Sequence, residues 1–333
     1  MEIINALEIY DNIYMIKVPL PGNPLKILNS YLLKGKKRNL LIDTGFNMDQ
    51  CYDTLKQNLD YLNVDMANTD IFFTHLHADH SGLMSRIMHE DTKIIMGKTD
   101  AEHMIYYQKM NDLRWEDLHD RFARAGYPPV ELDSNRTRNP AFLYVSDINE
   151  DIFFIDDGYE FDLEGFNLKA IETPGHTPGH MCVYDTEKKI LFAGDQLLFD
   201  ITPNVADWPA LKDSLGSYLE SLKKIREIEA DHVFVGHRKN DGDYKKRVDE
   251  LLKHHEARLN EAVLIIEQNP GATCFEIAGK MTWSIRSKNW ETFPPAQRWF
   301  AVGEAMAHLK HLVVTNRVKV SVDEVHNHYF PIN

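Results

Sequence analysis

Along the first 240 residues, stretches of alternating hydrophobic and polar residues are interrupted by single segments with helical periodicity. Strands are predicted where the alternation has a period of two or where a short apolar run lies between turns: 8–18, 30–45 (a hairpin), 70–74, 93–96, within 151–176, 181–195 (a hairpin) and 231–235. Helices are predicted at 48–62, about 81–90 and 212–230. Long antiparallel stretches broken by single helices favour two mixed sheets packed face to face, with helices outside.

The segment 98–140 differs from its surroundings. It is rich in helix-forming and aromatic residues and has no period-two alternation. The pattern predicts two helices, which end at the breaker formed by Gly126, Pro128 and Pro129. We therefore expect a helical insertion at about 98–140 within the sheet-forming part of the chain.

A polar, turn-rich segment at 238–244 divides the chain into a larger part, 1–240, and a smaller one, 245–333. The smaller part is predicted to contain helices at about 244–268, at 273–280 and at 295–313, and then a β-hairpin. Three helices followed by a hairpin are the outline of a winged helix. Within the first of these helices, His254 and His255 are predicted to be solvated.

Composition excludes several classes of protein. With 333 residues, 43% hydrophobic and 26% charged, the chain is long enough for a large globular domain plus a small one. No window approaches the ~20 apolar residues that span a bilayer, and the first residues lack a basic stretch followed by an apolar block. The cysteines Cys51, Cys182 and Cys274 are far apart. These features predict reduced thiols, no membrane association and a cytoplasmic location.

The net charge of −14 is unevenly distributed along the chain. Residues 241–333 contain twelve acidic and twelve basic side chains, so the whole acidic excess lies in residues 1–240. An acidic surface repels phosphate backbones at long range, whereas bound metal cations would offset part of the charge. A small-molecule substrate is therefore favoured over a nucleic acid.

The stretch IFFTHLHADHSG, at 71–82, begins as a buried strand and becomes abruptly polar. His75 and His77 alternate along an extended backbone and point the same way, and Asp79 and His80 follow where the chain leaves the strand. Imidazole and carboxylate donors together suit Zn, Mn or Fe. One cluster cannot close a site, so further ligands are required. Candidates that follow other apolar strands are His176, His180, Asp195 and His237.

These motifs, taken with LIDTG at 41–45, resemble the metallo-β-lactamase fold superfamily. The resemblance covers residues 1–240 and implies an α+β fold, the αββα metallo-β-lactamase sandwich. It also implies a set of metal ligands. The first metal would be held by His75, His77 and His176, the second by Asp79, His80 and His237, and Asp195 would bridge the two. Asp43 would orient a ligand histidine, and His180 would support the site without binding metal.

The resemblance implies a binuclear hydrolase with two divalent ions, zinc first and manganese or iron as alternatives. A metal-bridging hydroxide would attack the substrate directly, without a covalent enzyme intermediate, and Asp79 would orient it as a catalytic residue. The acidic surface and the aromatic insertion favour a small ester, thioester or lactone. A β-lactamase proper is disfavoured, because the ligand set with Asp79 and Asp195 is that of branches with other substrates. Asn204 and Trp208 are predicted to contact the substrate.

Residues 245–333 resemble the small winged-helix domain of some bacterial relatives and of related endoribonucleases. The alternative function is therefore a metal-dependent phosphodiesterase or endoribonuclease, in which this domain aids substrate binding. Its balanced charge argues against nucleic-acid binding. Covering the active site, or forming a homodimer contact, are the structural roles expected instead.

Overall fold

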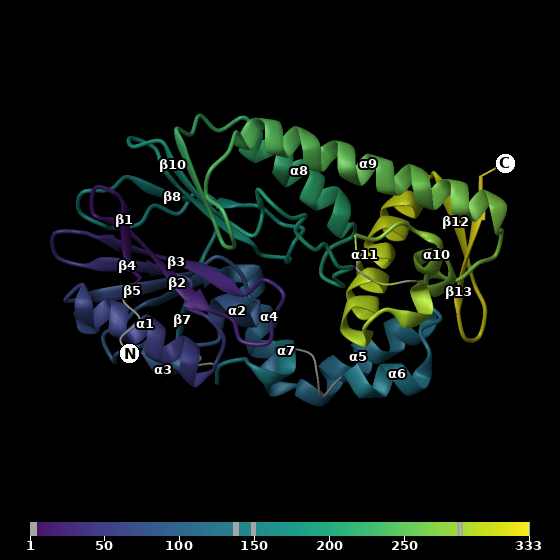
Figure 1. Cartoon of the computed structure of the whole chain (residues 1–333), viewed down its shortest axis with the longest axis horizontal. Helices are drawn as coiled ribbons and strands as arrows, with labels where there is room; N and C mark the ends of the chain where they lie inside the picture. Colours follow the sequence, from purple (N-terminus) through teal and green to yellow (C-terminus); the bar gives the residue numbers. More distant parts are fainter. Residues whose placement is uncertain (1–4, 136–139, 148–150, 285–286, 288, 333) are drawn as a thin grey trace.

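The computed structural model describes residues 5–135, 140–147, 151–284, 287 and 289–332. Two mixed β-sheets face each other and carry helices on their outer faces (Figure 1), which confirms the predicted αββα sandwich. The larger sheet has the order β1 (Leu7–Tyr10), β2 (Ile13–Pro19), β3 (Ile27–Lys34), β4 (Asn39–Ile42), β5 (Thr69–Phe73), β6 (Ile94–Gly97) and β7 (Ile152–Ile155). The smaller sheet has the order β11 (His232–Val235), β10 (Ile190–Gly194), β9 (Met181–Asp185) and β8 (Leu168–Glu172).

The directions of the strands decide where the loops gather. Strands β1 to β4 are antiparallel, whereas β4, β5, β6 and β7 run parallel to one another. In the smaller sheet β8 and β10 are each antiparallel to β9, and β11 is parallel to β10, so β8, β10 and β11 point the same way. Loops that leave the carboxyl ends of parallel strands meet at one edge of the sandwich.

Apolar side chains from both sheets fill the space between them. Tyr31 of β3 is stacked on Phe234 of β11, with ring centroids 5.7 Å apart, and meets Phe192 of β10 edge to face at 5.3 Å. These rings belong to a buried cluster that contains alternate residues of nearly every strand in the two sheets. Burying one face of each strand fixes its register, which in turn fixes where each strand ends.

The outer faces are covered by helices. A second buried cluster packs α1 (Asp49–Tyr61) and its neighbours on the larger sheet, and α8 (Ser214–Arg226) lies on the smaller one. The predicted helix at 81–90 is wrong in detail, because the chain forms two single turns, α2 (Ala78–Ser81) and α3 (Met84–Ile87). Gly82 lies between these turns, where a Cβ would come within 2.6 Å of the backbone nitrogen of Asn47.

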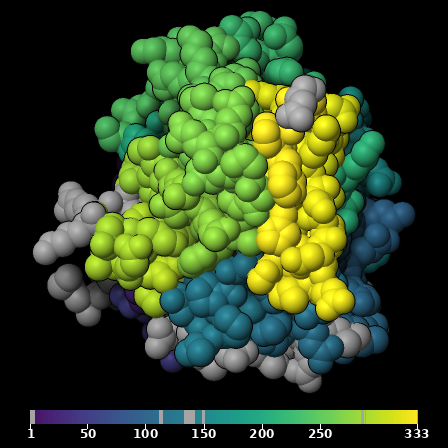
Figure 2. Space-filling view, turned by 90° about the vertical axis from the view of Figure 1, so that its right-hand side faces the viewer, coloured from purple at the N-terminus to yellow at the C-terminus, as the bar shows by residue number. Residues whose placement is uncertain are grey.

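The two helices predicted for the insertion are present as α4 (Lys98–Lys109) and α5 (Asn111–Arg124), and two short helices follow, α6 (Pro129–Asn135) and α7 (Pro140–Leu143). Residues 136–139 of the predicted insertion lie outside the described residues. Trp299 stacks on Phe122 of α5, with centroids 3.6 Å apart, so the insertion packs against the C-terminal part of the chain. Figure 2 shows the same neighbourhood, with the insertion beneath the C-terminal elements.

The C-terminal part has the predicted order of elements: α9 (Tyr244–Gln268), α10 (Cys274–Lys280), α11 (Pro295–Val314) and a hairpin of β12 (Val318–Val322) and β13 (Asn327–Pro331). Short 3-10 turns lie at Met66–Asn68 and Trp290–Thr292. The likeness to a winged helix, and the division of the chain at 240–245, stay predictions. One continuous apolar cluster joins these helices to α8, to the insertion and to the outer face of the smaller sheet.

One predicted surface residue of α9 is buried. His255 is fully buried and its Nδ1 lies 3.2 Å from Nε2 of His308 on α11, whereas His254 is exposed as predicted. The prediction was wrong for His255 because it took a polar side chain to be solvated, whereas His255 lies on the same stripe of α9 as the buried Leu251 and Leu259, which faces α8 and α11. Cys51, Cys182 and Cys274 are all buried free thiols. None of the helices among the described residues is long and apolar enough to cross a bilayer.

Candidate metal centre

Seven histidine and aspartate side chains meet at the edge of the sandwich where parallel strands end. His75, His77, Asp79 and His80 follow β5. The other three each follow a different strand of the smaller sheet, namely His176 after β8, Asp195 after β10 and His237 after β11. The strand ends are rigid, so the sheets place ligand candidates from distant parts of the sequence within reach of each other.

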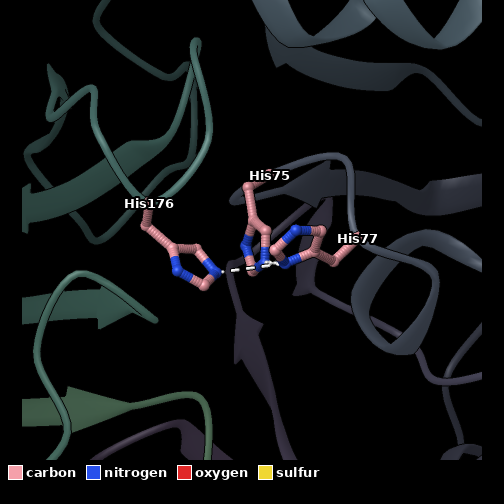
Figure 3. A group of neighbouring side chains, drawn as sticks. All are labelled: His75, His77 and His176. Carbon is pink, nitrogen blue, oxygen red and sulfur yellow. Dashed lines mark hydrogen bonds between the residues drawn. The ribbon is translucent and has the colours of Figure 1, made fainter. Parts of the chain in front are cut away.

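His75, His77 and His176 form the first group, drawn in Figure 3, where the three rings point at a common centre from two different loops. Nδ1 of His77 lies 3.0 Å from Nε2 of His75 and 3.1 Å from Nε2 of His176. Four bonds of 2.0–2.1 Å around a tetrahedral zinc would set such nitrogens about 3.3 Å apart. The spacing of this group therefore fits three ligands of one cation.

Asp79, His80 and His237 form the second group. Nε2 of His80 lies 3.2 Å from Nε2 of His237, and Asp79 Oδ2 lies 3.5 Å from the same His237 nitrogen. Two imidazole nitrogens that face each other this closely, beside a carboxylate, again converge as ligands of a cation would.

Asp195 lies between the two groups. Its Oδ2 is 3.3 Å from Nε2 of His237, 3.6 Å from Nε2 of His80 and 3.8 Å from Nε2 of His176. Its Oδ1 is buried without a hydrogen-bond partner among the described residues. A buried carboxylate oxygen without a donor is costly, and a bound cation would satisfy it. The donor set thus fits two cations with Asp195 reaching both.

The ring nitrogens that face away from the centre are held by the protein. His80 Nδ1–H donates to Asp43 at 2.7 Å, His176 Nδ1–H to the carbonyl of Asn204 at 2.7 Å, and His237 Nδ1–H to the carbonyl of Ile27 at 2.8 Å. His75 Nδ1 lies 2.9 Å from the hydroxyl of Thr74. Such bonds fix the tautomer and leave Nε2 of these four histidines free to bind a metal.

Asp43 and His180 lie behind the ligand groups, and their supporting role stays a prediction. Asp43 follows β4 in a left-handed conformation, with φ of 58°, and accepts hydrogen bonds from His80, from the Thr74 amide at 2.9 Å and from the Thr74 hydroxyl at 2.8 Å. His180 donates from Nδ1 to Thr173 at 2.8 Å, and its Nε2 accepts from the amide of Asp195 at 3.2 Å. His180 therefore holds the backbone of Asp195 and does not face the centre.

Gly236 is required by the closeness of the strands at the site. A Cβ at this position would lie 2.4 Å from Oδ1 of Asp195 and 2.9 Å from Cε1 of His80. Only glycine therefore lets the β11 loop carry His237 up to the other two side chains.

Burial and nearby charges lower the pKa of some histidines of the site and raise the pKa of others. Burial lowers the pKa of His77 to about 3, and burial together with neighbouring histidines holds the pKa of His75 well below its usual value. Burial alone would also lower the pKa of His237, but Asp195 and Asp79 raise it to about 10. The first group is thus neutral and ready to donate lone pairs, while the second lies in a negative field that would attract a cation.

The sequence reasoning missed Asp100, which ties the two loops of the first group together. This fully buried residue, in the first turn of α4, accepts from the Leu76 amide at 2.9 Å, the Thr177 hydroxyl at 2.6 Å and the Gly179 amide at 2.5 Å. Leu76 lies between His75 and His77, and Thr177 follows His176. A usable signal was present, because Asp100 follows the apolar strand β6, as the ligand candidates follow theirs.

Asn204 and Trp208 both contact His176. The carbonyl of Asn204 accepts from its imidazole, and the indole Nε1–H of Trp208 donates to its carbonyl at 2.9 Å. The indole ring also lies 6.2 Å from the ring of His77, centroid to centroid. The structure thus places both residues beside the centre, and their predicted contact with substrate stays a prediction.

Comparison with known proteins agrees with this geometry. The profile of the Metallo-beta-lactamase superfamily matches residues 25–237. The chain is 26% identical to a beta-lactamase-like protein 2 homolog of Caenorhabditis elegans, over 78% of this chain and 73% of that protein. It is 24% identical to the lactamase-like protein adaB of Aspergillus niger, over 86% of each.

Two solved structures match nearly the whole chain. A metallo-beta-lactamase family protein of Thermus thermophilus has a TM-score of 0.82 and 26% identity, over 98% of this chain and all of that one. A beta-lactamase domain protein of Burkholderia ambifaria has a TM-score of 0.81 and 21% identity, over 98% and 94% of the two chains. The shared fold therefore includes the insertion and the C-terminal elements as well as the sandwich.

Proposed function

This chain belongs to the metallo-beta-lactamase superfamily and is a metal-dependent hydrolase, and from that premise we propose that it uses two divalent cations to hydrolyse a small ester, thioester or lactone. The observation that carries the proposal is the convergence of two ligand groups on the shared carboxylate of Asp195. Zinc is the metal proposed first, because imidazole and carboxylate donors at this spacing suit it, with manganese and iron as alternatives.

In this proposal each group holds one cation. His75, His77 and His176 would hold the first, Asp79, His80 and His237 would hold the second, and Asp195 would reach both. When bound, such a pair of cations supplies a hydroxide at neutral pH and polarises the oxygen of the bond to be cleaved.

The protein's own side chains position the attacking water and accept a hydrogen bond from it. Burial raises the pKa of Asp79, but the hydrogen bond from His237 and the nearby His80 lower it to about 2, so this carboxylate is ionised at neutral pH. An ionised Asp79 at the mouth of the second group accepts a hydrogen bond from the attacking water and orients its lone pair towards the substrate. No serine or cysteine nucleophile is needed, and hydrolysis proceeds without a covalent enzyme intermediate.

The acyl substrate class is supported by charge and by the neighbourhood of the centre. The acidic excess of −14 repels polyanions, and it lies within the part of the chain that forms the sandwich. The indole of Trp208 lies next to His77 and offers an apolar surface for the acyl part of a substrate. We propose that Trp208 and Asn204 flank the bound substrate.

The proposal is tested with a panel of substrates and the zinc-loaded full chain. The panel contains an aryl ester, an acyl thioester, a lactone, a chromogenic β-lactam and bis(p-nitrophenyl) phosphate. We expect cleavage of one or more of the first three, and a loss of kcat of about 10²–10⁴-fold in Asp79→Asn with KM little changed. As a control, His254→Gln changes an exposed histidine of α9 and should keep full activity.

Two outcomes would overturn parts of the proposal. Cleavage of the phosphodiester alone would replace the acyl substrate with the alternative function, a metal-dependent phosphodiesterase or endoribonuclease. Full activity of the Asp79→Asn variant would remove Asp79 from the chemistry, whichever substrate is cleaved.

A further inference from the structure

The loop 197–207, which follows Asp195, is held almost entirely by side chains from elsewhere. Within the described residues, no backbone–backbone hydrogen bond joins any residue of 197–207 to another part of the chain or within the loop. Four of its carbonyl groups nevertheless accept hydrogen bonds, all from side chains, and these carbonyls belong to Leu198, Ile201, Asn204 and Asp207. The loop therefore depends on the residues that donate to it.

Arg247 of α9 provides two of these bonds. Its Nε donates to the carbonyl of Leu198 at 2.8 Å, and its Nη2 donates to the carbonyl of Ile201 at 2.9 Å. The two bonds leave different nitrogens of one planar guanidinium, whereas a lysine would have to make both from a single nitrogen. The first turn of α9 thus fixes the start of the loop.

Arg121 of the insertion helix α5 holds the end of the loop. Its Nη1 donates to the carbonyl of Asp207 at 2.5 Å, and its Nε lies 3.2 Å from Asp117 one turn earlier on the same helix. The neighbouring Trp208 is the residue whose indole donates to His176.

His311 of α11 holds the segment that follows. Its Nδ1 lies 2.8 Å from Oδ2 of Asp213, and the other oxygen of Asp213 caps α8 by accepting from the amide of Gly216 at 2.8 Å. The next residue, Ser214, accepts from the amide of Trp208 at 2.9 Å. Three elements outside the sandwich, α5, α9 and α11, therefore converge on 197–214.

The segment 197–214 in turn positions His176. Between its two anchored ends it presents the Asn204 carbonyl to the imidazole Nδ1–H at 2.7 Å and the Trp208 indole to the backbone carbonyl at 2.9 Å. His176 is thus fixed at its ring by the loop 197–207, for which the described residues show no backbone–backbone hydrogen bond, and at its backbone by Trp208, which follows that loop. Movement of the loop would therefore turn the His176 imidazole away from the centre.

We propose that Arg247, Arg121 and His311 are positioning residues for His176, and that the insertion and the C-terminal helices are in this way part of the metal centre's support. The inference rests on the proposed role of His176 as a metal ligand. It gives the C-terminal part of the chain a function that needs neither nucleic acid nor a second subunit.

The main test is Arg247→Met, which keeps the length of the side chain and removes both donors. We expect faster cleavage within 197–207 by proteinase K under native conditions, and binding of the cation at the His75–His77–His176 group weakened by about ten-fold or more in competition with a chelator. The d–d absorption spectrum of the Co²⁺-loaded protein should change, because it reports the ligands around the ion. Arg247→Lys should restore part of each effect.

Arg317→Met is the matched control for α9. Arg317 also anchors this helix, through Glu256 at 3.2 Å and Asn260 at 2.7 Å, but it does not touch the loop. This variant should leave the cleavage of 197–207 by proteinase K and the Co²⁺ spectrum unchanged. Arg121→Met should act like Arg247→Met, while Arg124→Met, an exposed arginine of the same helix, should not.

The outcomes separate this inference from the proposed function. Unchanged cleavage within 197–207 in Arg247→Met, or an Arg317→Met variant that loosens the loop as much as Arg247→Met does, would overturn the positioning role. A loop that loosens without any change in Co²⁺ spectrum or affinity would break the link from the loop to His176. Failure of the wild-type chain to bind Co²⁺ would overturn the proposed centre, and with it the coupling, while the proteolysis data would still report on the loop.

Discussion

Asp100→Asn is the substitution that most directly tests how the loops of the first ligand group are held. The carboxylate accepts three hydrogen bonds, from the Leu76 amide, the Thr177 hydroxyl and the Gly179 amide. An asparagine has one oxygen and can keep the two bonds made to Oδ2. Its NH₂ group would then face the Gly179 amide, so two donors would meet where a donor and an acceptor met before.

Two opposing effects decide how Asp100→Asn changes the free energy of unfolding. A buried amide left without its acceptor costs about 1–3 kcal/mol. Against this, burial raises the pKa of Asp100 to about 6, so the folded protein binds this proton more tightly than the unfolded chain does. Wild-type stability is therefore lost as the pH rises from about 4 through 6, by about 3 kcal/mol for a shift of about two units, and asparagine escapes that loss. The net change at pH 8 should stay within about 2 kcal/mol.

Metal binding should respond much more strongly than stability. Pushing the Gly179 amide away moves the loop that carries His176, while Leu76 lies between the two other ligands of the group. Losing an outer partner of a ligand typically weakens metal affinity by about 10–100-fold. We expect this loss in Asp100→Asn when zinc binding is measured by competition with a chromophoric chelator, alongside urea unfolding at pH 5 and pH 8.

Asp185→Asn supplies the control. Asp185 is also fully buried and accepts from the amides of Glu187 at 3.0 Å and Lys188 at 2.8 Å, but it closes the β9–β10 hairpin away from the ligand loops. Its substitution should leave zinc affinity unchanged. Unaltered zinc affinity in Asp100→Asn, or an equal loss in both variants, would refute the reasoning.

Further predictions concern the centre and the helix interface. Removing metal with a chelator should abolish hydrolysis and lower the melting temperature, and added zinc should restore both; activity that survives chelation would contradict a metal-dependent reaction. Gly236→Ala, whose Cβ would meet Asp195 at 2.4 Å, should lose at least one bound ion per chain by elemental analysis, and normal metal content would show that the loop can move aside. Burial lowers the pKa of His308 to about 4, so the unfolded chain takes up this proton more readily than the folded protein does. The free energy of unfolding should therefore be unaffected by His308 above pH 6.5 and should fall, by up to about 3 kcal/mol, as the pH drops from 6.5 towards 4. His308→Gln should flatten that slope in urea unfolding, and an unchanged slope would assign it to other groups.

The fold could be predicted from sequence because its strands are short, apolar and separated by turn residues. Burial on both sides of β5 and β10 produces apolar runs that stop abruptly at His75 and Asp195, so the same pattern marks both the strand and the site. The family resemblance then supplied the order of the ligand candidates. Even so, the structure was needed to show that Nδ1 of His77, but Nε2 of His75, faces the centre.

What sequence could not show depends on contacts between distant elements. Its place after strand β6 marks Asp100 as a candidate, but only the structure shows that the loops after β5 and β8 donate hydrogen bonds to it. Arg247 lies on a helix with many charged residues, and only the path of the loop after Asp195 reveals its two bonds. His255 lies on the apolar stripe of α9 and was predicted to be solvated because its side chain is polar, and only the structure shows the buried partner, His308, that it meets there.

The most direct test of the two-metal centre is the number of zinc ions that one chain binds. The purified full chain is stripped with a chelator, dialysed against micromolar zinc and measured by elemental analysis against protein concentration. We predict two ions per chain for the wild type and one for His176→Ala, which removes a ligand of the first group only. A wild-type chain that binds one ion or none would contradict the account.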